Sequence, residues 1–264
     1  MADSYQEYEG RPRRRGGRRV LIGFVVLILV LGGLLVVADR LAVGFAERAI
    51  ADQVRQEVAK QQVQASGPDV KVGGFPFLTQ VVNGRYEAIS IVLTDLSGNV
   101  EGKAVSLPKL DIDARNVKAS MDTLRTGQGE VVAESVKGTG TITYDSVTKL
   151  IDRKGIKLAG QDGKLTVTGP VQLPVVGEMT VHGTANLAVQ KGQVVIKFER
   201  LTADGLPNIP LVQGAISTYA KQLSINVPLP PLPFGLKVQE VRPLPEGLAV
   251  TAAAQNVPLR SSAG

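Results

Sequence analysis

The chain has 264 residues, of which 44% are hydrophobic and 20% are charged, so it is long enough and apolar enough to fold around a sizeable core. It contains no cysteine and one histidine, His182, which excludes disulfides, thiolate chemistry and any metal site built from several histidines. The net charge is +6, but the first 19 residues carry +3 of it, and the remaining residues are poor in aromatic side chains. Nucleic-acid binding is therefore not expected.

The N-terminus has the pattern of a membrane anchor. Residues 1–19 form an Arg-rich tail, and residues 20–38 follow without a single charge. A helix of that length rises about 28 Å, close to the thickness of the hydrocarbon core of a bilayer. The positive-inside rule then predicts a single-pass protein of the cell membrane, with a cytoplasmic tail and one extracytoplasmic domain over residues 39–264. A cleaved signal peptide is the alternative, because Val36-Val37-Ala38 resembles a cleavage site, and it exports the same domain.

The exported part begins with a helical pattern. Apolar residues recur at helical spacing over residues 39–65 with charges between them, which indicates an amphipathic helix continuing from the membrane segment. Ser66-Gly67-Pro68 is expected to end it. We expect its apolar face to dock on a sheet, and the alternative is a helix that lies on the membrane surface. That face consists of Leu41, Phe45, Ile50, Val54 and Val58.

Beyond Pro68 the apolar residues alternate with polar ones, which is typical of strands with one buried face. The fold class predicted is α+β, mainly β: the long helix packs on a curved antiparallel sheet of about ten strands, with two short helices at about 146–154 and 208–223. Asn83-Gly84 is typical of a hairpin turn. The clearest strands are 89–93, 110–114, 179–189, 194–198, 236–238 and 248–252.

A one-sided sheet with a single long helix must cover its apolar face. It either curls around the helix or leaves a trough for an apolar ligand. Aromatic residues make up only 4% of the chain, so the walls of such a trough would be smooth and aliphatic, which suits acyl chains.

The sequence lacks the motifs of catalysis. There is no Gly-x-Ser-x-Gly segment, and Gly138-Thr139-Gly140 does not extend into a dinucleotide fingerprint. Asp111 and Asp113 fall on the polar face of their strand, so they are not expected to bind a metal or transfer protons. His182 lies on the polar side of its strand too, without an evident partner. We therefore expect no enzyme activity, no catalytic residue, no metal and no cofactor.

Two short segments carry a resemblance to a known family. Gly74-Phe75-Pro76-Phe77-Leu78 follows the amphipathic helix, and Leu232-Pro233-Phe234-Gly235-Leu236 precedes the last strands. In this setting, over roughly residues 40–260, the chain resembles the LmeA-like phospholipid-binding family of actinobacterial envelope proteins, formerly a domain of unknown function.

The resemblance implies an exported curved sheet that binds phospholipid in an apolar cavity and serves cell-envelope lipid or lipoglycan maintenance. It supplies no catalytic residues. The alternative for the aromatic segments is that they pack a bend at the sheet edge. Two other functions remain open, a non-catalytic scaffold of an envelope complex and an envelope hydrolase. The residues expected to contact lipid, at the mouth or wall of the cavity, are Phe75, Phe77, Leu78, Phe234 and Leu236.

Overall fold

The computed structural model describes residues 16–60, 63–100, 102–126, 129–151, 155–173, 177–190, 193–203, 224–227 and 235–260. The fold is α+β and mainly β, as predicted, but the described strands form two antiparallel sheets where one was expected. The six-stranded sheet has the spatial order β1 (Asp69–Gly73), β2 (Arg85–Val100), β3 (Lys103–Ala119), β4 (Val131–Ile142), β11 (Gly247–Arg260) and β10 (Lys237–Leu244). The five-stranded sheet has the order β5 (Lys157–Gln161), β6 (Lys164–Leu173), β7 (Gly177–Gln190), β8 (Gln193–Ala203) and β9 (Ser224–Val227).

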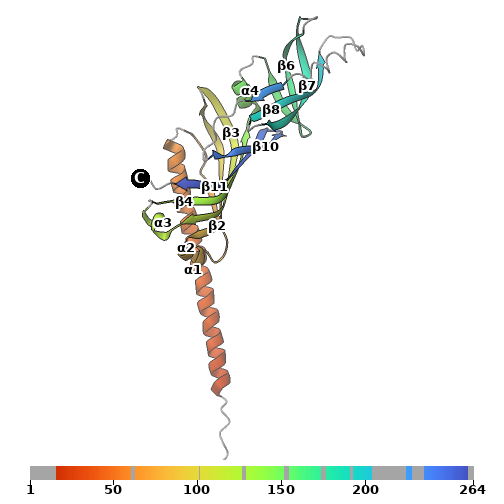
Figure 1. Ribbon diagram of the computed structural model, residues 1–264. Helices are drawn as coiled ribbons and strands as arrows, with labels where there is room; N and C mark the ends of the chain where they lie inside the picture. Colours follow the sequence, from red (N-terminus) through yellow and green to blue (C-terminus); the bar gives the residue numbers. More distant parts are fainter. Residues whose placement is uncertain are drawn as a thin grey trace, which may run out of the picture.

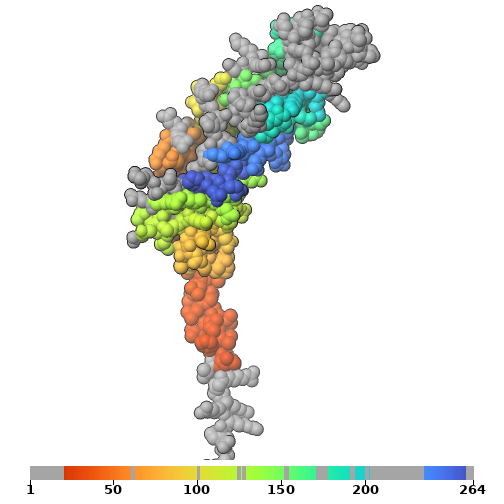
Figure 2. All heavy atoms as spheres, in the orientation of Figure 1, coloured from red at the N-terminus to blue at the C-terminus, as the bar shows by residue number. Residues whose placement is uncertain are grey.

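A single long helix contains both the charge-free segment and the region predicted to be an amphipathic helix. Helix α1 runs unbroken from Gly16 to Lys60. Its apolar part, from Leu21 onward, is long and apolar enough to cross a membrane, and none of that apolar window is buried. The N-terminal half of α1 stands free of the body, whereas its C-terminal half lies beside the six-stranded sheet (Figures 1 and 2).

The face that α1 turns toward the sheet differs from the predicted one. Leu41 and Phe45, expected to dock, are 61% and 69% exposed, whereas Val43 is buried. Ala42 and Ala46 also pack against the core beside Val43. Small side chains on this face allow a close approach of helix and sheet, which leaves the two bulky residues on the outside.

Among the described residues, three short helices interrupt the strands: α2 (Phe77–Asn83), α3 (Met121–Thr126) and α4 (Tyr144–Ile151). Helix α4 confirms the first of the two predicted short helices, and residues 208–223 lie outside the described residues. The hairpin predicted at Asn83-Gly84 was wrong. Asn83 ends α2, and Gly84 caps this helix with a left-handed backbone, φ 61°. Glycine tolerates positive φ in a helix cap as readily as in a hairpin turn, which is why the same dipeptide suits both.

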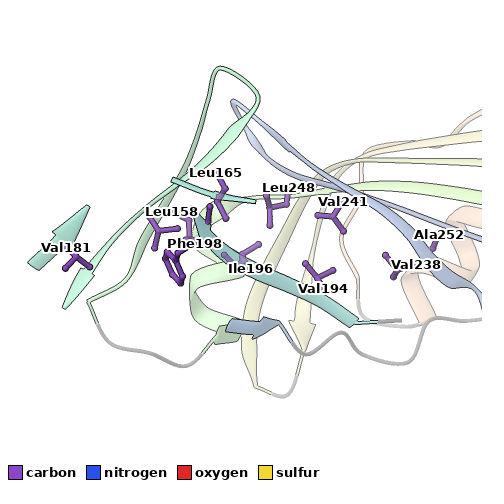
Figure 3. Packing of buried hydrophobic residues seen from close by; sticks show 13 residues of the cluster. Leu158, Leu165, Val181, Val194, Ile196, Phe198, Val238, Val241, Leu248 and Ala252 are labelled. Atoms are coloured by element: carbon purple, nitrogen blue, oxygen red, sulfur yellow. The ribbon is translucent and has the colours of Figure 1, made fainter. Parts of the chain in front are cut away.

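The buried residues form two cores. The basal core, next to α1 and α2, consists of Val43, Phe77, Tyr86, Ala114, Val117, Ala119, Ala133, Val136 and Val257. The distal core, under the five-stranded sheet, consists of Val147, Leu158, Leu165, Val167, Val181, Ala185, Val194, Ile196, Phe198, Val238, Val241, Leu248 and Ala252 (Figure 3). The last four come from β10 and β11, so these two strands of the six-stranded sheet also anchor the five-stranded one.

The six-stranded sheet bends along a line of polar residues. Asn116 of β3 and Asn256 of β11 have left-handed backbones, with φ of 49° and 51°. The register places both beside Glu134 of β4, since Val117, Ala133 and Val257 pair on one side of this line. Ala114 and Val117 both point into the basal core although they lie three residues apart, which regular alternation would forbid. The left-handed residues therefore keep one face of the sheet apolar through the bend.

Candidate functional site

The inner face of the six-stranded sheet carries a continuous apolar surface between the two cores. Strand pairing sets Ile91, Ile112 and Gly138 side by side on β2, β3 and β4. The next row on the same face holds Leu93, Leu110 and Gly140. We call these six residues the apolar floor. At the usual spacing of paired strands it extends about 10 Å from β2 to β4.

The floor joins the two cores without belonging wholly to either. Ile112 packs against the basal core, and Ala252, which pairs with Gly138 from β11, belongs to the distal core. Of the six floor residues, Leu93 is buried and the other five are partly exposed. An apolar surface left half-covered between two packed cores is a place where an apolar ligand can lie.

On β4 the apolar floor consists of two glycines, so no side chain rises from this strand. A Cβ added at Gly138 would meet no heavy atom of the described residues within 4 Å, so among these residues the space above Gly138 is open. A Cβ at Gly140 would touch the side chains of Leu107 and Leu110 at 3.6 Å, an ordinary contact distance. Glycine inside a strand often marks a close approach by a ligand or a second backbone. The two glycines are visible in the sequence as Gly138-Thr139-Gly140, but the pattern alone suggests a nucleotide-binding motif and not an apolar floor.

A hollow of about 240 Å³ adjoins the floor at its β2 edge. Leu93 belongs to both, and Val58 and Ala59 of α1 form the opposite wall. The rest of the lining is half apolar, with Val63, Ala65 and Pro68, and half polar, with Arg55, Gln64 and Ser66. The floor thus continues toward α1 into a small hollow of mixed polarity.

The opposite face of the same strands is polar. The Lys109 ammonium lies 2.8 Å from the Asp111 carboxylate, and the Ser90 hydroxyl donates a 2.6 Å hydrogen bond to Asp113. Within the part of the chain that the structure describes, no three His, Asp or Glu side chains gather as a metal site would need. The two aspartates are therefore occupied by local pairing on the outer face.

A second hollow, of about 490 Å³, lies on the five-stranded sheet and is lined by several threonines and His182. His182 Nδ1 lies 3.0 Å from the Thr168 hydroxyl, and the Thr202 hydroxyl donates to the His182 carbonyl. Such a lining suits water or a polar group and offers little to an acyl chain.

Two tyrosines near the cores titrate abnormally. Burial raises the pKa of Tyr144 to about 12, and the nearby Glu246 carboxylate adds to the shift, while the hydrogen bond from the Tyr144 hydroxyl to the Leu244 carbonyl opposes it. Burial also raises the pKa of Tyr86. Both shifts arise from apolar surroundings, so neither indicates an acid or a base poised for catalysis.

The aromatic segment expected to contact lipid lies at the base of the domain, beside α1. Phe77 is buried in the basal core with its ring centroid 6.1 Å from that of Tyr86. Phe75 and Leu78 are exposed, and the Arg40 guanidinium of α1 lies 5.2 Å from the centre of the Phe75 ring. The structure therefore separates the three: one side chain supports the core and two face outward.

The second aromatic segment is seen only in part. Phe234 lies outside the described residues. Leu236 is partly buried and packs against both the basal and the distal core. It therefore borders the same gap between the cores that the apolar floor occupies, which separates it from Phe75 and Leu78 at the base.

One residue of the basal region was missed from the sequence. Asp39 is 1% exposed, and its Oδ1 accepts a 2.9 Å hydrogen bond from the backbone N–H of Leu78. The sequence suggested only that this charge closes the membrane segment. Its burial depends on α2, a helix that the sequence pattern did not reveal.

These features define a mainly-β protein with one membrane-compatible helix and an apolar floor between two cores. The family model of LmeA-like phospholipid-binding proteins matches residues 37–253, and the chain belongs to this family. The resemblance expected from the aromatic segments is thereby confirmed. No curated protein and no solved structure matches the chain. The matched region begins at Val37, so it includes Asp39 and the whole apolar floor.

Proposed function

We propose that this protein is anchored in the cell membrane by residues 20–38 and binds phospholipid on the extracytoplasmic side, with the acyl chains lying on the apolar floor. Residues 1–19 would be cytoplasmic and residues 39–264 would form the lipid-binding domain. The observation that carries the proposal is the open space above Gly138, on an apolar surface between two packed cores. Membership of a phospholipid-binding family supports it.

The chemistry of such binding is burial of hydrocarbon. Each CH₂ removed from water contributes about 0.8 kcal/mol, so about ten carbons on the floor would contribute about 8 kcal/mol, which is comparable to the cost of association. No charged side chain is needed on the floor itself. The headgroup would remain at its rim, where the polar outer parts of the sheet begin.

The five residues expected to contact lipid take different parts in this proposal. Leu236 packs against both cores just before β10, on the far side of β11 from the floor, and would touch an acyl chain that extends this far. Phe75 and Leu78 face outward beside the end of the membrane segment, where lipid would enter or leave. Phe77 would act indirectly by packing the base, and Phe234 remains a predicted contact. This role in moving or holding lipid would serve upkeep of the cell envelope, without catalysis.

The test is native mass spectrometry of the full chain, released from a detergent that does not mimic phospholipid. The proposal expects one phospholipid per chain, displaced by an excess of added phospholipid. A chain that emerges free of lipid and takes up none when phospholipid is added would overturn it and favour the scaffold alternative. Lipid that emerges shortened or split would favour the hydrolase alternative.

A further inference from the structure

A group of bulky apolar side chains is exposed around α1 where this helix enters the domain. Soluble surfaces carry scattered apolar residues, but a contiguous group indicates a contact surface. Figure 1 shows α2 next to α1 at the base of the domain, with α3 to the left of them. We call the group the basal collar. It consists of Leu41, Phe45, Phe75, Leu78, Val82 and Met121, with exposures from 37% to 82%.

Named contacts hold the collar together. The hydrogen bond from Leu78 N–H to Asp39 ties the start of α2 to α1. The contact of Arg40 with the Phe75 ring adds the preceding loop. At the other end of α2, a Cβ on Gly84 would lie 3.5 Å from the Cα of Ser120, next to Met121. The collar residues therefore come from α1, α2, the loop before α2, and α3, whose preceding residue Ser120 lies beside the cap of α2.

The length of α1 sets the height of the collar above a membrane. A span that ends at Ala38 places Leu41 and Phe45 about 5 and 10 Å beyond the hydrocarbon core, at 1.5 Å per helical residue. The headgroup layer on one side of a bilayer is about 5–8 Å thick, so Leu41 lies within this layer and Phe45 just beyond its outer edge. Because Asp39 holds the N-terminus of α2, Leu78 and Phe75 lie at this same level.

The charges beside the collar suit that layer. Arg40 lies over the Phe75 ring, and the Arg48 guanidinium lies 5.8 Å from the centre of the Phe45 ring. Arginine above an aromatic ring is suited to an interface, because the ring enters the acyl boundary while the guanidinium stays with the phosphates. A surface that binds a folded partner protein could lie anywhere on the domain, whereas a surface that binds the membrane must lie where the span ends, as the collar does.

We infer that the basal collar inserts into the interfacial layer of the outer leaflet, so that the domain rests on the bilayer. This inference depends on the membrane anchoring in the proposed function, but not on the cargo lipid. It gives the exposed aromatic residue of Gly-Phe-Pro-Phe-Leu a partner: the membrane surface itself. It also brings the domain down to the lipid that it would bind.

The absence of cysteine makes a direct test possible, since any single introduced cysteine is the only thiol. Three variants of the full chain, V30C in the span, V82C in the collar and Q161C on the five-stranded sheet, are labelled with an environment-sensitive fluorophore. Each is placed in vesicles of phosphatidylcholine and phosphatidylglycerol. Quenching is then measured with iodide in the water and with phosphatidylcholine that carries a nitroxide near its headgroup. Val82 and Gln161 are both exposed, so neither label disturbs a packed position.

We expect the Val82 label to resist iodide several-fold better than the Gln161 label and to be quenched by the lipid nitroxide. A Val82 label as open to iodide as the Gln161 label, with the Val30 label still inside the bilayer, would overturn the collar and leave the anchor intact. A Val30 label open to iodide would overturn both. Loss of lipid binding in mass spectrometry, with the Val82 label protected, would refute the proposed cargo and support the collar.

Discussion

The backbone N–H of Leu78 donates a 2.9 Å hydrogen bond to Asp39 Oδ1, across 39 residues of sequence. Helix α2 has Pro76 at its N-cap position and no side-chain hydrogen bond from that residue. The carboxylate from α1 therefore takes the place of a local cap and also offers a negative charge to the positive end of the helix dipole. The last residue of the charge-free segment before it is Ala38, so this segment and the domain meet at this bond.

Replacing Asp39 with alanine should destabilise the domain. The change removes the acceptor of the Leu78 N–H in a buried position, and the loss of a cap costs about 0.5–2 kcal/mol. Asp39→Asn keeps an oxygen acceptor and should recover most of the stability. The measurement is urea unfolding of the full chain in nanodiscs, followed by circular dichroism.

The matched control for this change is Asp52→Ala. Asp52 lies on the exposed side of α1 and pairs only with Arg55, at 2.9 Å. An exposed pair of this kind is worth about 0.5 kcal/mol or less, so its removal should leave the unfolding midpoint nearly unchanged. Equal losses in D39A and D52A would show that the cap contributes nothing beyond a surface charge.

Gly138→Leu should block lipid binding without unfolding the protein. The new side chain enters the space above the floor, where no atom of the described part of the chain lies within 4 Å of the added Cβ, and leucine is no worse than glycine inside a strand. Phospholipid per chain, read by native mass spectrometry, should fall by most of its wild-type value. Lys137→Leu adds the same apolar bulk to the exposed outer face and should bind lipid as the wild type does. Full lipid occupancy in G138L would remove the floor as the binding surface.

The sequence was sufficient for strands but not for the way they are divided. Alternation at Ile89–Leu93 and Leu110–Ala114 predicted two strands that the structure contains. The division into two sheets depends on β10 and β11. Strand β11 pairs with β4 and β10 pairs with β11, yet the two bury Val238 and Leu248 against the five-stranded sheet. Periodicity reports only that a face is buried. It does not report which element covers it.

Short elements near the base were harder to predict for a related reason. In Phe77–Asn83 the seven residues complete fewer than two helical turns, too few for a period to show. Capping by Asp39 comes from another helix, so no signal for the start of α2 exists beside it. The same dependence on distant residues explains α1: Leu41 and Phe45 fit the helical stripe, but the neighbours of Val43 decided which face was buried.

The free energy of unfolding should fall as the pH rises above 10, because folding makes the Tyr144 hydroxyl harder to ionise. The folded pKa of Tyr144 is about 12, whereas the unfolded chain releases this proton at the model value of 10.0. The unfolded state is therefore favoured as its tyrosine ionises. Below pH 10 Tyr144 does not change the free energy of unfolding. Between pH 10 and 12 it lowers that free energy progressively, and the raised pKa of Tyr86 acts in the same direction.

The measurement is the unfolding midpoint of the full chain at a series of pH values, compared with Tyr144→Phe. The variant should lose about 0.5–1.5 kcal/mol at neutral pH, because the Leu244 carbonyl loses its donor. It should then show a weaker decline above pH 10, with the remainder due to Tyr86. Parallel pH profiles for the two proteins would mean that Tyr144 ionises normally in the folded state.

The bend of the six-stranded sheet should depend on residues that tolerate a left-handed backbone. Asn116 has φ of 49°, and its side-chain amide donates a 2.9 Å hydrogen bond to Glu134. A β-branched residue is strained at positive φ, so Asn116→Val should destabilise the domain by about 1–3 kcal/mol. Asn116→Gly removes the strain along with the side chain and should cost less. Lys118→Val, two residues further along β3 and equally exposed, should be nearly neutral, because its backbone is extended and valine favours strands. Urea unfolding of the three variants checks the order, and an N116V protein as stable as K118V would show that the bend does not rely on this residue.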